Sequence, residues 1–146
     1  GAGDPTPLGA VPEEALRPFR ARYLAVEAIV RKHFQTALDW WHPTAHAGKP
    51  PTWDHRDHWH IDSGRGEPTW EGRKNQVRYL QAALRYVWGA EGPRGPLKID
   101  GVNGPQTIET TLRAHGHDGH DGHLLGEPDV WWPAFLEETA KKGFAL

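Results

Sequence analysis

Apolar residues recur at steps of three and four positions in four stretches of the chain, and this period predicts amphipathic helices. The first helix is expected over about 18–41, with Pro18 near its start, because a proline further inside would remove a hydrogen bond. The other helices are expected over about 74–88, 105–114 and 133–142. In the first helix the apolar positions are Leu16, Phe19, Tyr23, Val26, Val30, Phe34, Leu38 and Trp41.

The other three helices also have apolar positions that we expect to face the core. These positions are Val77, Leu80, Leu84 and Val87 in the second helix, Ile108 and Leu112 in the third, and Phe135, Leu136 and Ala140 in the last, with Trp131 and Trp132 just before it.

Glycines and prolines break the helical period over residues 42–72, which predicts a long loop with a short two-stranded piece around 57–61. A second loop is expected at 115–123, where His, Gly and Asp alternate in a tract typical of a solvated segment. The fold class that follows is mainly α. We expect a small helical bundle with a long His/Trp-rich loop that carries a short β-strand or hairpin.

Length and composition limit the possible functions. A chain of 146 residues suits one ordinary core, so we expect a single domain over 13–146 after a flexible Gly/Pro-rich leader over 1–12. The formal net charge of −2 argues against a nucleic-acid partner. No apolar run approaches the roughly 18 residues of a membrane span, so none is expected. Because the chain also lacks methionine, even at position 1, we expect a processed product or a piece of a longer polypeptide.

The strongest chemical signal is the run Asp57-His58-Trp59-His60-Ile61-Asp62. In an extended segment its alternation places both histidines and the final aspartate on one face. Zinc takes such nitrogen and oxygen ligands, and without cysteine any metal must be held by His, Asp or Glu. The same spacing also suits an acid/base pair, and the alternative is a polar loop with solvated histidines. Further histidines lie upstream, at His42, His46 and His55.

A short alternating run after the second helix ends in a turn that opens the third helix. Asp100 and Gly101 are turn residues, and Gly104 is expected to take a positive φ. Pro105 fits the first helical position, where its missing N–H is not needed. Thr107 is placed to bond back to the turn. These residues alone predict a helix–turn–helix unit.

The same region carries a family pattern. It consists of Val77, Leu80, Gln81 and Leu84, then Ile99, Asp100, Gly101, Gly104, Pro105, Thr107 and Leu112. With this pattern, residues 76–114 resemble the three-helix peptidoglycan-binding domain found on many bacterial and phage cell-wall enzymes. The resemblance implies that peptidoglycan is the partner and that Asp100, Gly101, Gly104 and Thr107 belong to the binding site. The alternative is that these residues only build the helix–turn–helix unit.

The four residues Asp57-His58-Trp59-His60 are similar to a motif of zinc D-alanyl-D-alanine carboxypeptidases and related L,D-endopeptidases. The resemblance implies that zinc is the cofactor and His60 one of its ligands. Asp57 would be the general base that takes a proton from the metal-bound water, and His58 would polarise the substrate. The family's other ligands are a histidine upstream of the motif and an aspartate seven residues after that histidine. The one pair in this chain with that spacing, His55 and Asp62, overlaps the motif itself. His42 or His46 would therefore complete the site.

The two resemblances together predict a protein that acts on the bacterial cell wall, in an extracellular or wall-associated location. The first interpretation is a small zinc-dependent peptidoglycan peptidase. The second is a peptidoglycan-binding module without catalytic activity, in which the His-rich loop is only an elaboration. The third is a metal-dependent nuclease or other toxin domain, because a His-Trp-His loop also suits the activation of water against phosphate.

Overall fold

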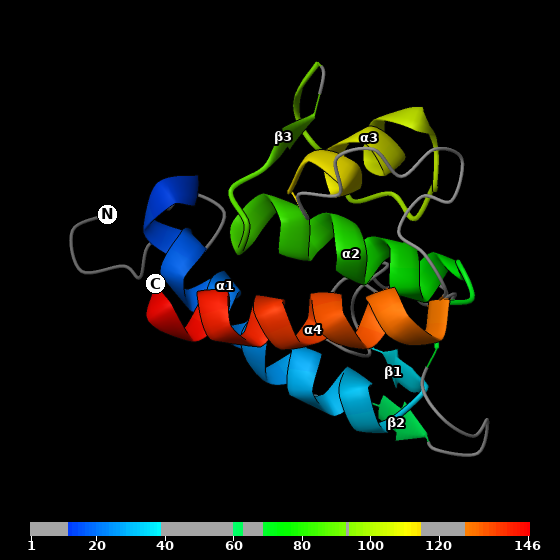
Figure 1. Cartoon of the computed structure of the whole chain (residues 1–146). Helices are drawn as coiled ribbons and strands as arrows, with labels where there is room; N and C mark the ends of the chain where they lie inside the picture. The colour runs from blue at the N-terminus through cyan, green and yellow to red at the C-terminus, as the bar shows by residue number, and fades with distance from the viewer. Residues whose placement is uncertain (1–11, 39–59, 63–68, 93, 115–127) are drawn as a thin grey trace, which may run out of the picture.

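The computed structural model describes residues 12–38, 60–62, 69–92, 94–114 and 128–146. Within these ranges the fold is mainly α, as the apolar pattern predicts. The helices are α1 Glu13–His33, α2 Lys74–Tyr86, α3 Pro105–Ala114 and α4 Pro128–Ala145, and the strands are β1 Thr36–Leu38, β2 His60–Asp62, β3 Glu91–Gly92 and β4 Gly95–Pro96. Figure 1 shows α1, α2 and α4 packed together, with α3 on the side of α2 that faces away from α4.

Several predicted segments lie wholly or partly outside the described residues. They are the leader over 1–11, the loop residues 39–59 and 63–68, and the His-Gly-Asp tract within 115–127. The single-domain organisation expected for 13–146 stays a prediction. Among the helices that the structure describes, none is long and apolar enough to cross a membrane.

Helix α1 starts and ends earlier than its apolar period predicts. It begins at Glu13 and ends at His33, so Pro18 is the sixth residue of the helix instead of lying at its start. The proline removes one backbone donor, and contacts with α2 support this part of the helix. Arg17 Nε donates to the carbonyl oxygen of Tyr86 at 3.0 Å, and Arg20 Nη1 donates to the Tyr86 hydroxyl at 2.7 Å.

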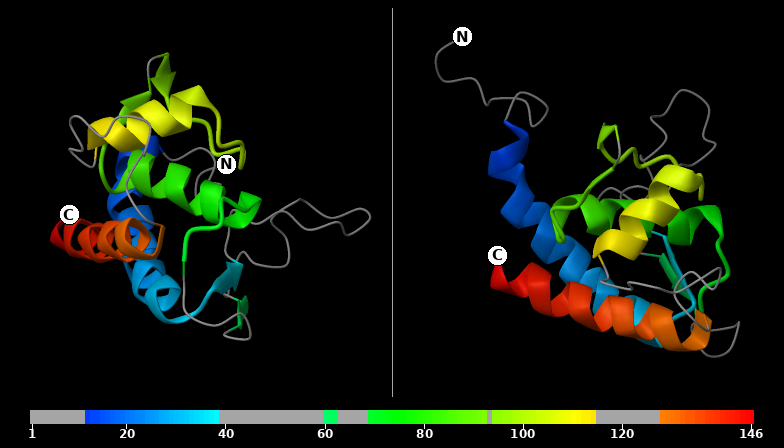
Figure 2. Two further views of the ribbon diagram at one scale, coloured as in Figure 1. Left: turned by 45° about the vertical axis from the view of Figure 1, so that its right-hand side comes forward. Right: turned by 45° about the horizontal axis from the view of Figure 1, so that its top comes forward.

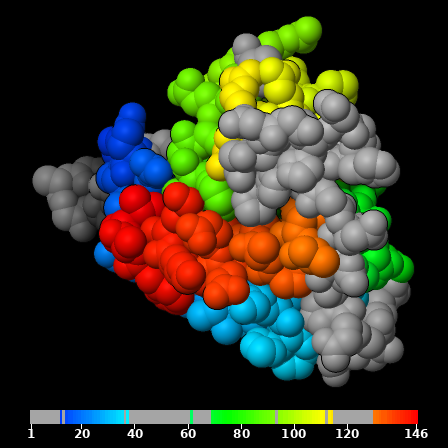
Figure 3. Space-filling model, in the orientation of Figure 1, coloured from blue at the N-terminus to red at the C-terminus, as the bar shows by residue number. Residues whose placement is uncertain are grey.

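The buried face of α1 is not the predicted apolar stripe. Phe19 and Val26 of that stripe are 69% and 38% exposed. The buried apolar side chains are mostly small, because α4 approaches α1 closely: a Cβ built on Gly143 would lie 2.6 Å from the Ala21 oxygen and from Ala25 Cβ. Figures 2 and 3 show α4 packed across α1 at an angle. The buried apolar residues of α1 are Ala21, Leu24, Ala25 and Ala28.

Helix α2 occupies the centre of the core and matches its prediction most closely. It begins at Lys74 as predicted and ends at Tyr86, two residues early. All four predicted core positions are buried: Val77, Leu80, Leu84 and Val87. The apolar period therefore identifies the buried positions correctly in α2, the helix that other elements contact on more than one side.

Helix α4 supplies the aromatic part of the core. It begins at Pro128, five residues before its predicted start, so both tryptophans lie inside the helix and not just before it. Trp132 stacks on Phe135 with ring centroids 5.9 Å apart, and Phe135 stacks on Trp88 at 5.4 Å. Phe135 and Leu136 are fully buried, as predicted. Stacked rings of this kind bury large apolar areas and fix the position of α4 on α2.

The predicted short strand near the His-rich motif is present, but its partner is unexpected. Strand β2 pairs antiparallel with β1, so that Ala37 lies opposite Ile61 and Leu38 opposite His60. The sequence had predicted helix for the residues of β1, and that prediction is wrong. The buried Arg31 side chain holds β1 against the end of α1, because its Nη2 donates to the carbonyl oxygen of Ala37 at 2.7 Å. The strand pair is thereby attached to the end of α1.

Candidate functional site

The predicted zinc site is described only at one residue. His60 lies at the start of β2, opposite Leu38, and the position of its side chain is not described. Within the described ranges, no group of three or more metal-ligating side chains lies together. The zinc site therefore stays a prediction. The other residues predicted for it lie outside the described residues: His42, His46, Asp57 and His58.

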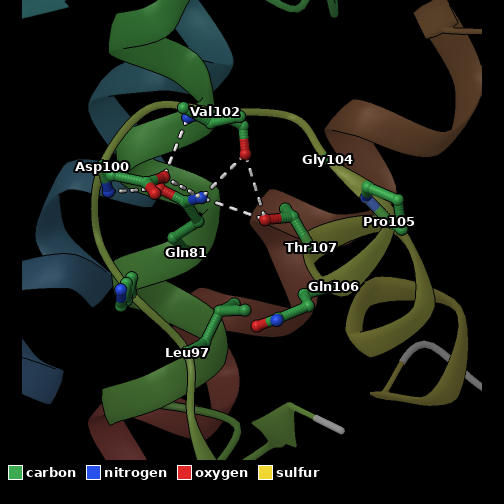
Figure 4. Close-up of a pocket in the computed structure, with 9 residues that line it drawn as sticks. Gln81, Leu97, Asp100, Val102, Gly104, Pro105, Gln106 and Thr107 are labelled. Atoms are coloured by element: carbon green, nitrogen blue, oxygen red, sulfur yellow. Dashed lines mark hydrogen bonds between the residues drawn. The ribbon is translucent and has the colours of Figure 1, made fainter. Parts of the chain in front are cut away.

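The turn between α2 and α3 is described in full and is held by one buried side chain, Gln81 (Figure 4). Its Nε2 donates to Asp100 Oδ1, the Val102 carbonyl oxygen and Thr107 Oγ1 at 3.0, 3.1 and 3.0 Å. Its Oε1 accepts from the backbone N–H groups of Asp100 and Gly101 at 3.0 and 2.9 Å. A single amide on α2 therefore fixes both ends of the turn.

Two predictions for the turn can be compared with this geometry, a hydrogen bond of Thr107 and a positive φ at Gly104. The Thr107 hydroxyl donates back to the Val102 carbonyl oxygen at 3.3 Å, as expected. The positive φ falls at Gly101, at 78°, and not at Gly104, so that prediction is wrong. A Cβ at Gly101 would also meet the Arg78 side chain at 3.2 Å. Gly104 instead provides the carbonyl that accepts an early backbone hydrogen bond of α3, at 3.1 Å.

The buried face of α3 consists largely of threonines, although the sequence predicts Ile108 and Leu112. Thr107, Thr110 and Thr111 are buried, Ile108 is half-buried, and the Leu112 side chain is not described. The hydroxyls of Thr110 and Thr111 each donate to the carbonyl oxygen four residues earlier, at 2.6 Å. Because the polar atom is satisfied within the helix, the rest of the side chain can be buried.

Asp100 carries the ionisable group of the turn. Its partial burial would by itself raise the pKa of the carboxyl. Hydrogen bonds from the Val102 N–H and from Gln81, together with the charge of Lys98, outweigh this effect. The pKa of Asp100 therefore lies below its ordinary value of 3.8. The folded turn favours the ionised carboxylate.

A hollow of about 280 Å³ opens beside the turn. Of the four residues predicted for peptidoglycan contact, Asp100, Gly104 and Thr107 line this hollow, while Gly101 points its N–H at Gln81. The sequence assigned no role to Gln81, although this residue was part of the family pattern. It also missed several exposed residues of the lining: Lys98, Val102, Pro105 and Gln106.

Comparison of the chain with protein-family models, with curated proteins and with solved structures gives no match. The site is therefore interpreted from its own geometry. This geometry provides a rigid turn and a small open hollow. The exposed side chains on the rim of the hollow are charged, polar and apolar.

We expect Gln81→Leu to lower the free energy of unfolding by at least about 2 kcal/mol, because it leaves two backbone N–H groups of the turn without their acceptor. Urea unfolding followed by tryptophan fluorescence measures the change. The matched control is Gln106→Leu, the same substitution at an exposed position, which should stay within about 0.5 kcal/mol of the parent. Equal stability of the two variants would contradict the role given to Gln81.

The lowered pKa of Asp100 predicts a pH dependence of stability. Because the folded state has the lower pKa, the contribution of this carboxylate is complete well above pH 3.8 and is lost as the pH falls through the folded-state value. Asp100→Asn keeps an acceptor oxygen but removes the charge, so it has no such contribution to lose. The stability difference between parent and variant should therefore shrink between about pH 6 and pH 2. Denaturant unfolding across this range measures it, and a constant difference would contradict the assignment.

Proposed function

We propose that this chain binds bacterial peptidoglycan through the hollow beside the turn at 100–107. The observation that carries the proposal is the Gln81 amide, which holds the turn by five hydrogen bonds and leaves the rim side chains exposed. The resemblance of residues 76–114 to peptidoglycan-binding domains points to the same surface. A turn ordered before binding loses little conformational entropy when a ligand arrives.

The side chains on the rim suit a polymer of sugars and short peptides. Lys98 offers a cation for a carboxylate of the stem peptide, and Gln106 offers an amide that both donates and accepts hydrogen bonds. Val102, which is 59% exposed, and Pro105 offer apolar contact for sugar rings and alanine methyl groups. Ligand sites typically combine an apolar patch with a small number of polar groups.

Co-sedimentation with purified, insoluble sacculi tests this proposal. The parent chain should pellet with sacculi, and the double variant Lys98→Gln, Gln106→Ala should bind about tenfold more weakly, since the cation at position 98 and the amide at position 106 are lost. Lys141→Gln provides the control, because it makes the same charge change at an exposed position on α4. No sedimentation of the parent would contradict peptidoglycan binding. Parent-like binding of the double variant would contradict the assignment to this hollow.

A zinc-dependent peptidase is the second candidate, and the observation that favours it is the pairing of β2 with β1. This pairing attaches the backbone of His60 to the end of α1, where Arg31 holds β1. A metal ligand needs a scaffold of this kind. Zinc at His60, with His42 or His46, would acidify a bound water, and Asp57 and His58 would keep the roles that the resemblance implies.

Metal analysis of untagged protein tests the second candidate. One zinc per chain is expected, with affinity falling below about pH 6 as imidazoles protonate. Asp57→Asn should retain the metal and lose on the order of 10²–10⁴ in muropeptide hydrolysis, whereas His60→Ala should lose both. A zinc-free protein, or an active Asp57→Asn variant, would contradict this mechanism. Cleavage of DNA or RNA in place of muropeptides would favour the nuclease interpretation.

A further inference from the structure

One face of α1 carries large apolar side chains that the described part of the molecule does not bury. The apolar period of the sequence assigns Leu16, Phe19, Val26 and Val30 to this face, which is the face that an amphipathic helix ordinarily turns toward a core. In the structure Phe19 and Val26 are 69% and 38% exposed, and Leu16 and Val30 are half-buried. Ile29, next to them on the helix, is 45% exposed. These five residues form what we call the outer stripe of α1.

The outer stripe is long enough to be an interaction surface. Single exposed apolar residues are common, but several on one face of one helix make a patch of the kind that marks a contact with a partner. From Leu16 to Val30 the stripe extends about 21 Å, at 1.5 Å per residue. The right-hand view of Figure 2 shows the first half of α1 at the edge of the molecule, with α2 and α3 both on one side of it.

The charges at the two ends of α1 indicate which partner fits the stripe. Glu14 is exposed near the start of the helix, and Lys32 and His33 lie in its last turn. Lys32 also pairs with Glu137 of α4 at 3.7 Å, in a partly exposed contact. A second α1 that runs in the opposite direction brings the acidic start of each copy beside the basic end of the other. It also opposes the two helix dipoles, whereas a parallel arrangement would place like charges together.

The spacing of the stripe is self-complementary in the same antiparallel arrangement. Phe19 and Ile29 are equally far from position 24, so a two-fold axis at that height places Phe19 of each copy against Ile29 of the other. Val26 then lies close to the axis, where both copies contribute it. The exposed Arg22, between Phe19 and Val26, is held toward the end of α4, because its Nη2 donates to the carbonyl oxygen of Leu146 at 3.0 Å.

We propose that the outer stripe of α1 is the contact between two copies of this chain, which pair antiparallel about a two-fold axis. The pairing removes the large apolar side chains of both copies from water. A stable interface buries roughly 800 Å² on each partner, which is more than one face of a single short helix provides. The dimer is therefore weak, with a dissociation constant on the order of 10–100 µM. The inference goes beyond peptidoglycan binding and stands if that binding fails, because the hollow beside the turn consists of other residues.

Sedimentation equilibrium of the full chain, at concentrations on both sides of this dissociation constant, tests the dimer. The average mass of the parent should rise from one chain toward two as the concentration increases. Phe19→Glu should bind itself at least about tenfold more weakly, and its fold should be retained because the side chain is mostly exposed. The matched control is Val130→Glu, the same charge at an apolar residue of α4 that is 65% exposed, and it should pair like the parent. If the parent stays monomeric, or if Phe19→Glu pairs like the parent, the proposal is wrong.

Mixing two variants tests the antiparallel arrangement. Ile29→Lys should also weaken self-association at least about tenfold. An equal mixture of Phe19→Glu and Ile29→Lys should recover pairing at least about tenfold over either variant alone, because the new carboxylate of one copy then meets the new ammonium group of the other. At the other end of the same contact, the original Phe19 and Ile29 still meet. Mixing cannot repair a loss of fold, so recovery identifies the contact itself. No recovery in the mixture would overturn the proposal.

Discussion

The structure depends most on one buried polar group, the side-chain amide of Gln81. The segment after α2 has no long strand or helix through which to pair its backbone, and a buried N–H without an acceptor costs about 1–3 kcal/mol. Gln81 accepts from two such groups, at Asp100 and Gly101, and donates to acceptors of the same turn. A helix packed in the core therefore positions an exposed loop, and the rim of the neighbouring hollow is ordered as a result.

Helix α2 can do this because it is fixed on its other sides. The Tyr79 hydroxyl donates to the carbonyl oxygen of Leu24 in α1 at 2.7 Å. Just beyond the end of the helix, Trp88 Nε1 donates to the Thr139 hydroxyl in α4 at 2.9 Å. Polar atoms on mostly apolar side chains thus connect α2 to two neighbouring helices within a core that is otherwise aromatic and aliphatic. Gln81 extends the same arrangement to a third neighbour, the turn before α3.

A second hollow lies at the end of α2, and one short segment of the chain forms part of the wall of both hollows. Pro96 lines the hollow at the end of α2, and the next two residues, Leu97 and Lys98, line the hollow beside the turn. Leu97 is only 2% exposed, and its carbonyl oxygen accepts from Arg85. One buried leucine therefore anchors the backbone between the two hollows.

The sequence by itself determined the features whose causes are local. The apolar period, together with the glycines and prolines on either side of it, placed the start of α2 at Lys74. Proline and turn chemistry placed the start of α3 at Pro105. The tertiary structure alone decided which face of α1 is buried. Because α4 lies so close to α1, the face with small side chains is buried, and not the predicted apolar stripe. It also decided the partner of β2, the bonds of Gln81 and the positions of both hollows. These features depend on distances between segments far apart in the chain, and a local pattern carries no information about such distances.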